Sequence, residues 1–445
     1  MSQTLLIKGA TVVNEGTSQV MDVLVRDGRI ERIDSSISEP NEACRVINAE
    51  GLHLLPGCID DQVHFREPGL THKASIGTES RAAVAGGVTS FMEMPNTVPA
   101  ALTQELLEDK YAIASRTSPA NYSFFMGVSN DNVEEVLRTN EKKQDVCGVK
   151  IFMGSSTGSM LVDNYTVLER LFGGVELLIA THCEDERIIA ENKKKYPDPT
   201  DASFHPLIRD EEACFESSLA AVQMAKKHDT RLHILHITTE KELRLFTNLF
   251  PIEQKRITSE VCVHHLHFTA DDYARLGNQI KCNPAIKAAH NKEALWAALL
   301  DDRLDIIATD HAPHTAEEKA LPYAQAPAGL PLVQHPLLIM LKYAKEGRIS
   351  VERVVEKMAH APARCFRIED RGYIREGYWA DLVLVDLNAT TTVTQESLLY
   401  KCGWSPLEGE QFPARIVRTF VNGTEVWDGR QVIEGNTGMR MRFSR

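Results

Sequence analysis

The chain has 445 residues, of which 43% are hydrophobic and 25% charged, so it is long enough for one large domain or two in a soluble globular protein. Its formal net charge of −13 argues against a nucleic-acid-binding surface. The start shows no leader pattern, and no apolar run approaches the roughly 20 residues that span a bilayer. Nine cysteines without a Cys-x-x-Cys pair indicate free thiols in a reducing compartment. We predict a cytoplasmic protein that binds neither nucleic acid nor membrane.

The character of the chain changes twice. Residues 1–54 contain short strand-like runs and are predicted to be the N-terminal part of a small β domain. Residues 55–364 alternate β-like runs with amphipathic helical stretches, and residues 365–445 turn β-like again and are predicted to complete the small β domain. The predicted strands outside the alternating region are Thr4–Lys8, Val20–Arg26, Arg45–Ala49, Gly372–Ile374, Ala380–Asp386 and Val417–Trp427.

The alternating region predicts a (β/α)8 barrel, because eight β-like runs separated by helical stretches form a closed parallel sheet with helices outside. The runs are Leu54–His64, Gly87–Pro95, Tyr122–Val128, Cys147–Met153, Leu177–Cys183, Arg231–Ile237, Ile257–His264 and Leu304–Asp310. Helical patterns between them include Ala74–Ala85, Leu106–Ser115, Glu211–His228 and Lys292–Leu300.

The first run carries the most informative polar residues. It begins as an apolar strand at Leu54 and ends at Pro68-Gly69, which reads as a buried strand opening into a loop. Side chains alternate along a strand, so Gln62, His64 and Arg66 project to one side. A packed core does not need a metal ligand, an amide and a cation in one small volume, whereas a site for a metal and an anionic substrate does.

Other polar residues fall at the same end of the predicted strands, where a barrel of this kind holds its chemistry. Each has an ordinary structural reading on its own: a lone histidine is more often a hydrogen-bonded core residue, and Asp310 could cap a helix. Together they form the imidazole and carboxylate set that a cation such as zinc prefers. The residues are Asn96, Lys150, His182, His236, Asp310 and His314, with His264 and His265 ending the seventh run.

Lys150 lies within an apolar strand, and a lysine beside a divalent cation must lose its charge. A neutral amine can take up carbon dioxide to give a carbamate, an anion able to bridge two metal ions. The residues alone make Lys150 a candidate for this modification and do not show that it occurs.

The chain resembles the cyclic amidohydrolases and, within them, the dihydroorotases. The resemblance runs over nearly the whole length and is carried by five stretches: His64-Phe65-Arg66-Glu67-Pro68-Gly69, Ala85-Gly86-Gly87-Val88-Thr89, Met94-Pro95-Asn96-Thr97-Val98-Pro99, Thr309-Asp310-His311-Ala312-Pro313-His314 and Gly377-Tyr378-Trp379-Ala380-Asp381-Leu382-Val383. It implies a metal-bearing barrel with a small β domain, in agreement with the pattern of the runs.

The resemblance also implies roles for single residues. His64 and Asp310 would bind a first metal ion, His182 and His236 a second, and carboxylated Lys150 both. Asp310 would also move the proton. The substrate carboxylate would be held by Arg66, Asn96 and His314, and the ring edge by Asn283.

Two features leave alternatives open. The family has His-x-His at the end of the first strand, whereas this chain has Gln62-Val63-His64, and an amide oxygen is a weaker zinc ligand than imidazole. Two zinc ions, or a single one, are therefore expected, with Gln62 as a candidate ligand. Some dihydroorotases use an aspartate after strand four as the bridging group, and Asp163 is the nearest candidate, although Lys150 fits the lysine-type motif better.

The function implied is reversible, zinc-dependent hydrolysis of the cyclic amide of dihydroorotate to N-carbamoyl-aspartate in pyrimidine biosynthesis. An allantoinase or hydantoinase is the nearest enzymatic alternative, although the pairing of Arg-Glu-Pro-Gly with Pro-Asn-Thr favours dihydroorotase. A non-catalytic structural partner of aspartate transcarbamoylase is an alternative from another class, raised by Gln62 and lowered by the retained ligands. The resemblance also implies a homodimer.

Overall fold

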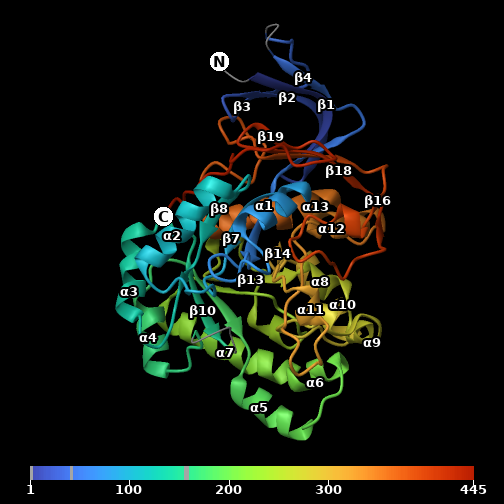
Figure 1. Ribbon diagram of the computed structural model, residues 1–445. Helices are drawn as coiled ribbons and strands as arrows, with labels where there is room; N and C mark the ends of the chain where they lie inside the picture. Colours follow the sequence, from blue (N-terminus) through green and yellow to red (C-terminus); the bar gives the residue numbers. More distant parts are fainter. Residues whose placement is uncertain (1–3, 41–43, 155–159) are drawn as a thin grey trace.

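The computed structural model describes residues 4–40, 44–154 and 160–445. A small β domain sits on a helix-clad barrel, and its sheet is built from both ends of the chain (Figure 1). The strands run in the order β19-β18-β15-β5-β1-β2-β3, with β4 paired to β1. Their bounds are β1 Thr4–Asn14, β2 Thr17–Arg26, β3 Arg29–Asp34, β4 Arg45–Asn48, β5 His53–Pro56, β15 Leu382–Asp386, β18 Arg415–Val421 and β19 Thr424–Trp427.

The two halves of this sheet meet where β5 pairs antiparallel with β15, with Leu54 opposite Leu384. The C-terminal hairpin β18–β19 turns at Asn422-Gly423, and both residues have positive φ, of 51° and 75°, as a tight hairpin turn requires. The predicted small domain with strands from both chain ends is confirmed. The strand predicted at Gly372–Ile374 is wrong, because Gly372 has φ of 79° and the segment bends there to stack Tyr373 on His360.

The barrel strands are all parallel. They are β6 Cys58–Val63, β7 Val88–Glu93, β8 Asn121–Phe124, β9 Met126–Gly127, β10 Val149–Met153, β11 Ile179–Cys183, β12 Leu232–Ile234, β13 Ile257–Cys262 and β14 Ile306–Ala308. The third run is one strand interrupted at Phe125, since β8 pairs with β7 and β9 with β10. The ring closes between Val63 and His311 through a parallel bridge, with the His64 amide donating to the His311 carbonyl at 2.7 Å. The predicted (β/α)8 barrel is confirmed.

The predicted run Leu54–His64 is two strands, because the chain passes from the small domain into the barrel at Gly57. The amide of Gly57 donates to Asp381 of the small domain, and the amide of Cys58 donates to Gly87 of the barrel. A Cβ at Gly57 would lie 2.0 Å from the Thr89 hydroxyl oxygen, so only glycine fits this passage.

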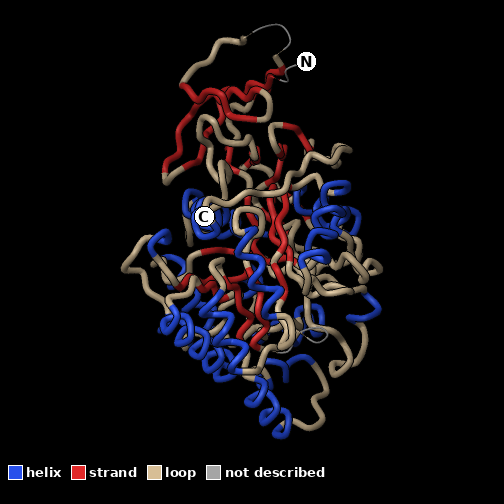
Figure 2. Tube along the Cα trace, turned by 90° about the vertical axis from the view of Figure 1, so that its left-hand side faces the viewer, coloured by secondary structure: helices blue, strands red, loops and turns tan. Residues whose placement is uncertain are grey.

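Helices surround the lower part of the molecule, whereas the upper sheet consists of strands and loops (Figure 2). Helix α7 has the bounds predicted for it. It is capped by Asp210, whose side chain accepts from the Ala213 amide at 2.9 Å, and Asp229, the residue after its last turn, has a left-handed φ of 53°. The α-helices are α1 Ile76–Ala85, α2 Gln104–Thr117, α3 Val133–Leu137, α4 Tyr165–Gly174, α5 Glu186–Lys195, α6 His205–Ile208, α7 Glu211–His228, α8 Val263–His267, α9 Tyr273–Leu276, α10 Ala289–Leu300, α11 Ala316–Lys319, α12 Pro336–Lys345, α13 Val351–Val355 and α14 Ala361–Phe366.

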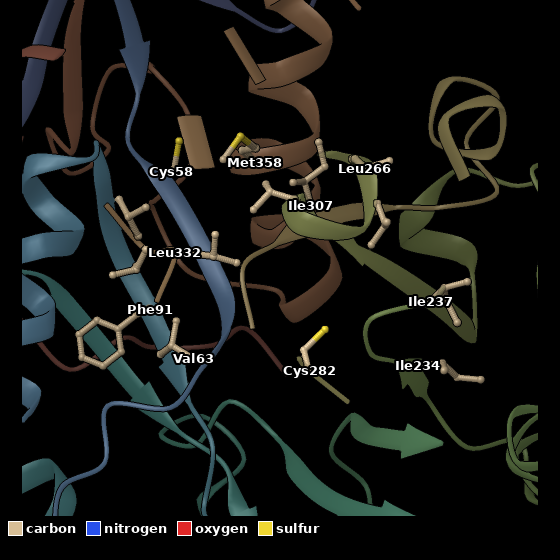
Figure 3. Packing of buried hydrophobic residues seen from close by; sticks show 14 of the residues in the cluster. Cys58, Val63, Phe91, Ile234, Ile237, Leu266, Cys282, Ile307, Leu332 and Met358 are labelled. Carbon is tan, nitrogen blue, oxygen red and sulfur yellow. The ribbon is translucent and has the colours of Figure 1, made fainter. Parts of the chain in front are cut away.

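The main apolar core fills the space around the strands, where Val63 of β6 and Phe91 of β7 pack with residues such as Ile307 of β14 (Figure 3). A second cluster occupies the amino-terminal end of the barrel, where Phe366 of α14 and Phe443 from the last segment are fully buried. The Met441 amide donates to Tyr122 at 3.0 Å. This end of the barrel is therefore plugged, and the carboxyl ends of the strands remain for a site.

A buried ion pair in the small domain also accepts a hydrogen bond from the barrel. The carboxylate of Asp381 pairs with Arg371 and accepts from Asn121 of β8 at 3.1 Å, and both charged side chains are under 5% exposed. Replacing Asp381 by Ala leaves Arg371 buried and unpaired, so we expect a loss of about 3–5 kcal/mol in the free energy of unfolding. Urea denaturation followed by circular dichroism measures it.

The matched control is Glu176→Ala, which removes the exposed partner of Lys143 and should leave the urea midpoint almost unchanged. A similar midpoint for the two variants would contradict the importance of the Asp381 pair.

Candidate active site and metal centre

A cavity of about 340 Å³ lies at the carboxyl ends of the barrel strands. All ten residues that were assigned a site role from the sequence line it, although they come from seven different segments of the chain. They are Gln62, His64, Arg66, Asn96, Lys150, His182, His236, Asn283, Asp310 and His314. Asp163, the alternative bridging residue, is exposed, accepts from Asn130 at 3.1 Å and is outside the described lining of the cavity.

The first and last strands bring His64, Gln62 and Asp310 together. Asp310 Oδ1 lies 3.1 Å from His64 Nε2 and accepts from Gln62 Nε2 at 3.2 Å. On its other side, His64 Nδ1 donates to Asn96 Oδ1 at 2.8 Å. Burial lowers the pKa of His64, which favours the neutral ring. A neutral ring that donates through Nδ1 turns the lone pair of Nε2 toward a carboxylate oxygen, an arrangement suited to a cation between them.

Strands β11 and β12 bring His182 and His236 together, with His182 Nδ1 3.0 Å from His236 Nε2. His182 Nε2 contacts Glu184 Oε2 at 3.0 Å, and Glu184 also pairs with Arg209 at 2.5 Å. Although burial raises it, Arg209 and His182 hold the pKa of Glu184 down at about 2. A carboxylate behind a histidine fixes the ring and leaves the opposite nitrogen free to bind metal. These residues therefore fit a second metal position.

Lys150 on β10 is 1% exposed, and its Nζ makes no hydrogen bond within the described residues. Lys110, equally buried, pairs with Glu93 and donates to the Met94 carbonyl at 2.8 Å. Burial lowers the pKa of Lys150 to about 7, although Asp310 and Glu260 oppose the shift. A large fraction of the amine is therefore neutral near physiological pH, as carbamate formation requires.

Arg66 forms another part of the cavity wall. Its Nε donates to the Pro313 carbonyl at 3.0 Å, and its Nη2 lies 3.1 Å from His314 Nε2. Lys73 Nζ approaches His314 Nδ1 at 2.9 Å. Burial lowers the pKa of Arg66 only to about 10, so the guanidinium stays charged. This wall presents positive charge to the cavity.

Three site residues have left-handed backbone conformations: Arg66 with φ of 68°, His236 with 37° and Asp310 with 48°. Non-glycine residues in this region each cost on the order of 1–3 kcal/mol, and they persist only where the surrounding structure imposes them. All three follow a barrel strand directly or within three residues, so the strain turns their side chains into the cavity.

Sequence reasoning missed the residues beneath the site. The sequence pattern assigns no role to Glu184 or to His233, which contacts Asp61 at 3.3 Å and Glu260 at 3.2 Å in the barrel interior. Glu260 also accepts from the His236 amide at 3.1 Å, so it positions a candidate ligand. The available signal was a carboxylate inside the otherwise uncharged strand Ile257–Cys262.

Comparison with known proteins decides the family. Residues 53–426 match the amidohydrolase family. The chain belongs to the amidohydrolase family. This amidohydrolase is 32% identical to a dihydroorotase from Methanothermobacter thermautotrophicus over 94% of its own length and 93% of the relative's. It is 31% identical to an allantoinase from Solibacter usitatus over 98% of its own length and 96% of the relative's.

Among solved structures, the amidohydrolase resembles the L-hydantoinase (dihydropyrimidinase) from Arthrobacter aurescens, with a TM-score of 0.92 and 27% identity over 99% of this chain and all of the other. The chain is therefore a metal-dependent cyclic amidohydrolase. Among its described helices, none has the length and apolar character needed to cross a membrane.

Glu184 should control metal affinity through His182. In Glu184→Gln the neutral amide no longer polarises the ring and Arg209 loses its partner, so we expect metal affinity to fall about 10–100-fold. Competition with a chelator, followed by elemental analysis of the retained metal, measures the change.

Glu169→Gln is the control, because Glu169 contacts His228 at 2.8 Å in the same way but on the surface. Equal metal retention by both variants would show that Glu184 does not act on the metal centre.

Proposed function

We propose that this amidohydrolase is a dihydroorotase, which hydrolyses the ring amide of dihydroorotate reversibly to N-carbamoyl-aspartate. The observation that carries the proposal is Arg66, a charged and buried side chain in the wall of the cavity. Dihydroorotate bears a carboxylate beside the ring, and hydantoin and allantoin do not.

Arg66 is 5% exposed, and no carboxylate of the described residues lies within ion-pair distance of its guanidinium. The other deeply buried arginines are paired, Arg209 with Glu184 and Arg371 with Asp381. A buried guanidinium without an anion is costly, and its planar fork matches a carboxylate. A substrate carboxylate would supply the missing charge.

The other substrate contacts follow from the cavity wall. Asn96 and His314 flank Arg66 and would complete the carboxylate pocket. Asn283 also lines the cavity, and His205 Nε2 contacts its Oδ1 at 2.9 Å. That contact leaves the Asn283 amide nitrogen available to the edge of the ring.

The donor set favours zinc, with His64 and Asp310 at one position, His182 and His236 at the other, and the Lys150 carbamate between them. The Gln62 amide donates to Asp310, so it would support the first position through that carboxylate. When bound, the metal supplies Lewis acidity and makes water acidic near neutral pH.

Asp310 would serve as the catalytic acid and base. In hydrolysis its carboxylate accepts a proton from the attacking water while the new carbon–oxygen bond forms at the ring carbonyl. It then delivers that proton to the ring nitrogen as the carbon–nitrogen bond breaks. The contacts to His64 and Gln62 hold its Oδ1 in place. Ring closure uses the same steps in reverse.

A hydantoinase is the second candidate, favoured by the TM-score of 0.92 to the L-hydantoinase. Such an enzyme acts on a ring without the carboxylate, and the buried Arg66 would then have no substrate partner.

Turnover of dihydroorotate, hydantoin and allantoin by the purified protein, measured side by side, tests the proposal. We expect kcat/KM to be highest for dihydroorotate. Arg66→Ala should raise KM for dihydroorotate by about 10–100-fold, since a charge-assisted hydrogen bond is worth about 1.5–3 kcal/mol.

Arg66→Lys keeps the charge without the fork, and it should give an intermediate KM. Higher kcat/KM for hydantoin than for dihydroorotate would assign the second function. An unchanged KM for dihydroorotate in Arg66→Ala would remove Arg66 from substrate binding.

Activation by carbon dioxide should depend on pH through Lys150. With a pKa of about 7, its amine is neutral in about a tenth of the molecules at pH 6 and about nine-tenths at pH 8. Metal-free protein incubated with zinc and bicarbonate should therefore regain more activity at pH 8 than at pH 6, when all samples are assayed at one pH. Equal recovery at both values, with or without bicarbonate, would contradict carbamate formation.

A further inference from the structure

A second group of metal-binding side chains lies behind Gln62. Strand β13 ends at Cys262, and α8 follows without a loop and carries His264 and His265 in its first turn. The Cys262 sulfur and one nitrogen of each histidine lie within 4.8 Å of one another. All three side chains are buried, at 0%, 0% and 3% exposure.

The surrounding protein leaves part of the hydrogen-bonding capacity of these histidine rings unused. In the described part of the chain, the ring of His264 has only a weak contact with the Thr309 backbone and no well-formed hydrogen bond, and His265 Nδ1 has no partner. The other nitrogen of His265 contacts the Pro284 carbonyl at 3.2 Å, which fixes the ring with Nδ1 free. Buried polar atoms nearly always have partners, so two adjacent buried histidines that each have a ring nitrogen without a partner indicate a ligand.

Leu266, the next residue of α8, lies in the apolar core, so the group is sealed from bulk water (Figure 3). The surroundings carry negative charge, because Asp310 contacts Gln62 and Glu260 precedes Cys262 by two residues on β13. Nearby carboxylates favour a cation at this place.

Gln62 provides the fourth contact. Its Nε2 donates to Asp310 at 3.2 Å, and its Oε1 lies 3.7 Å from the Cys262 sulfur. The carboxylate therefore fixes the amide with its oxygen turned toward the cysteine. The Gln62 side chain therefore acts in two directions. Its amide nitrogen donates toward the catalytic cavity, and its amide oxygen is an acceptor on the side of Cys262.

We propose that Cys262, His264, His265 and the Gln62 oxygen form a separate site for a thiophilic divalent cation, with zinc as the best fit. One sulfur, two imidazoles and an amide oxygen match a tetrahedral zinc ion and suit magnesium or calcium poorly. Bonds of about 2.0–2.3 Å place tetrahedral ligand atoms roughly 3.3–3.8 Å apart, so small side-chain rotations complete the site. The site is distinct from the proposed catalytic centre, whose ligands contain no sulfur.

Cobalt(II) substitution of the full-length protein tests the site, because a thiolate bound to cobalt gives a charge-transfer absorption band in the near ultraviolet. We expect the band in the wild type, its loss in Cys262→Ser and its retention in Cys147→Ser. Cys147 is an equally buried cysteine at the other end of the barrel. No band in the wild type, or a band retained in Cys262→Ser, would overturn the proposal.

X-ray absorption at the zinc edge of the wild type gives the same answer without a variant. A zinc–sulfur distance of about 2.3 Å is expected, and a first shell of nitrogen and oxygen alone would overturn the proposal. Turnover of dihydroorotate is measured on the same samples. Zinc–sulfur bonding without turnover would refute only the proposed function, and turnover without zinc–sulfur bonding would refute only this site.

Discussion

The hydrogen bond from the His64 amide to the His311 carbonyl closes the barrel, and the geometry of the cavity depends on that closure. It fixes the end of β6 beside the segment that follows β14, so His64 and Asp310 meet although 246 positions separate them in the chain. Parallel pairing then places the ends of β10, β11 and β12 around the same opening. One set of backbone hydrogen bonds thereby assembles ligands that no local sequence motif could bring together.

Charge in the barrel interior is organised in layers. Paired carboxylates and a histidine lie deepest, with Asp61 and Glu260 against His233. The ligand imidazoles, Asp310 and the guanidinium of Arg66 line the cavity at the carboxyl ends of the strands. The low dielectric of the interior strengthens each of these interactions. The cavity therefore offers positive charge to an anionic substrate group at Arg66, and imidazole and carboxylate ligands to cations. The left-handed backbone conformations of Arg66, His236 and Asp310 each cost conformational free energy, which the packing of the surrounding structure must offset.

Strand periodicity and the polar residues at strand ends were enough to predict the barrel and nine of the residues that line the cavity, whereas Asn283 came only from the resemblance to the cyclic amidohydrolases. They could not reveal the division at Gly57, because an apolar run reads the same whether one sheet or two sheets pair with it. The irregular segment at Gly372 has the composition of a strand, and only its positive φ excludes one. The sequence did not predict roles for Glu184, Arg209 and Glu260. These residues contact the candidate ligands or each other rather than the cavity, and their contacts depend on packing between distant segments.

The pairing of β5 with β15 sets an order of events during synthesis. Their partners Leu54 and Leu384 lie 330 positions apart. Strands β1 to β5 leave the ribosome first, yet one edge of their sheet stays open until the whole barrel region has been made. An open strand edge is a template for association with other chains, and contacts over such a separation form slowly. The edge of β5 is thus left without its partner strand until the C-terminal segment has been made.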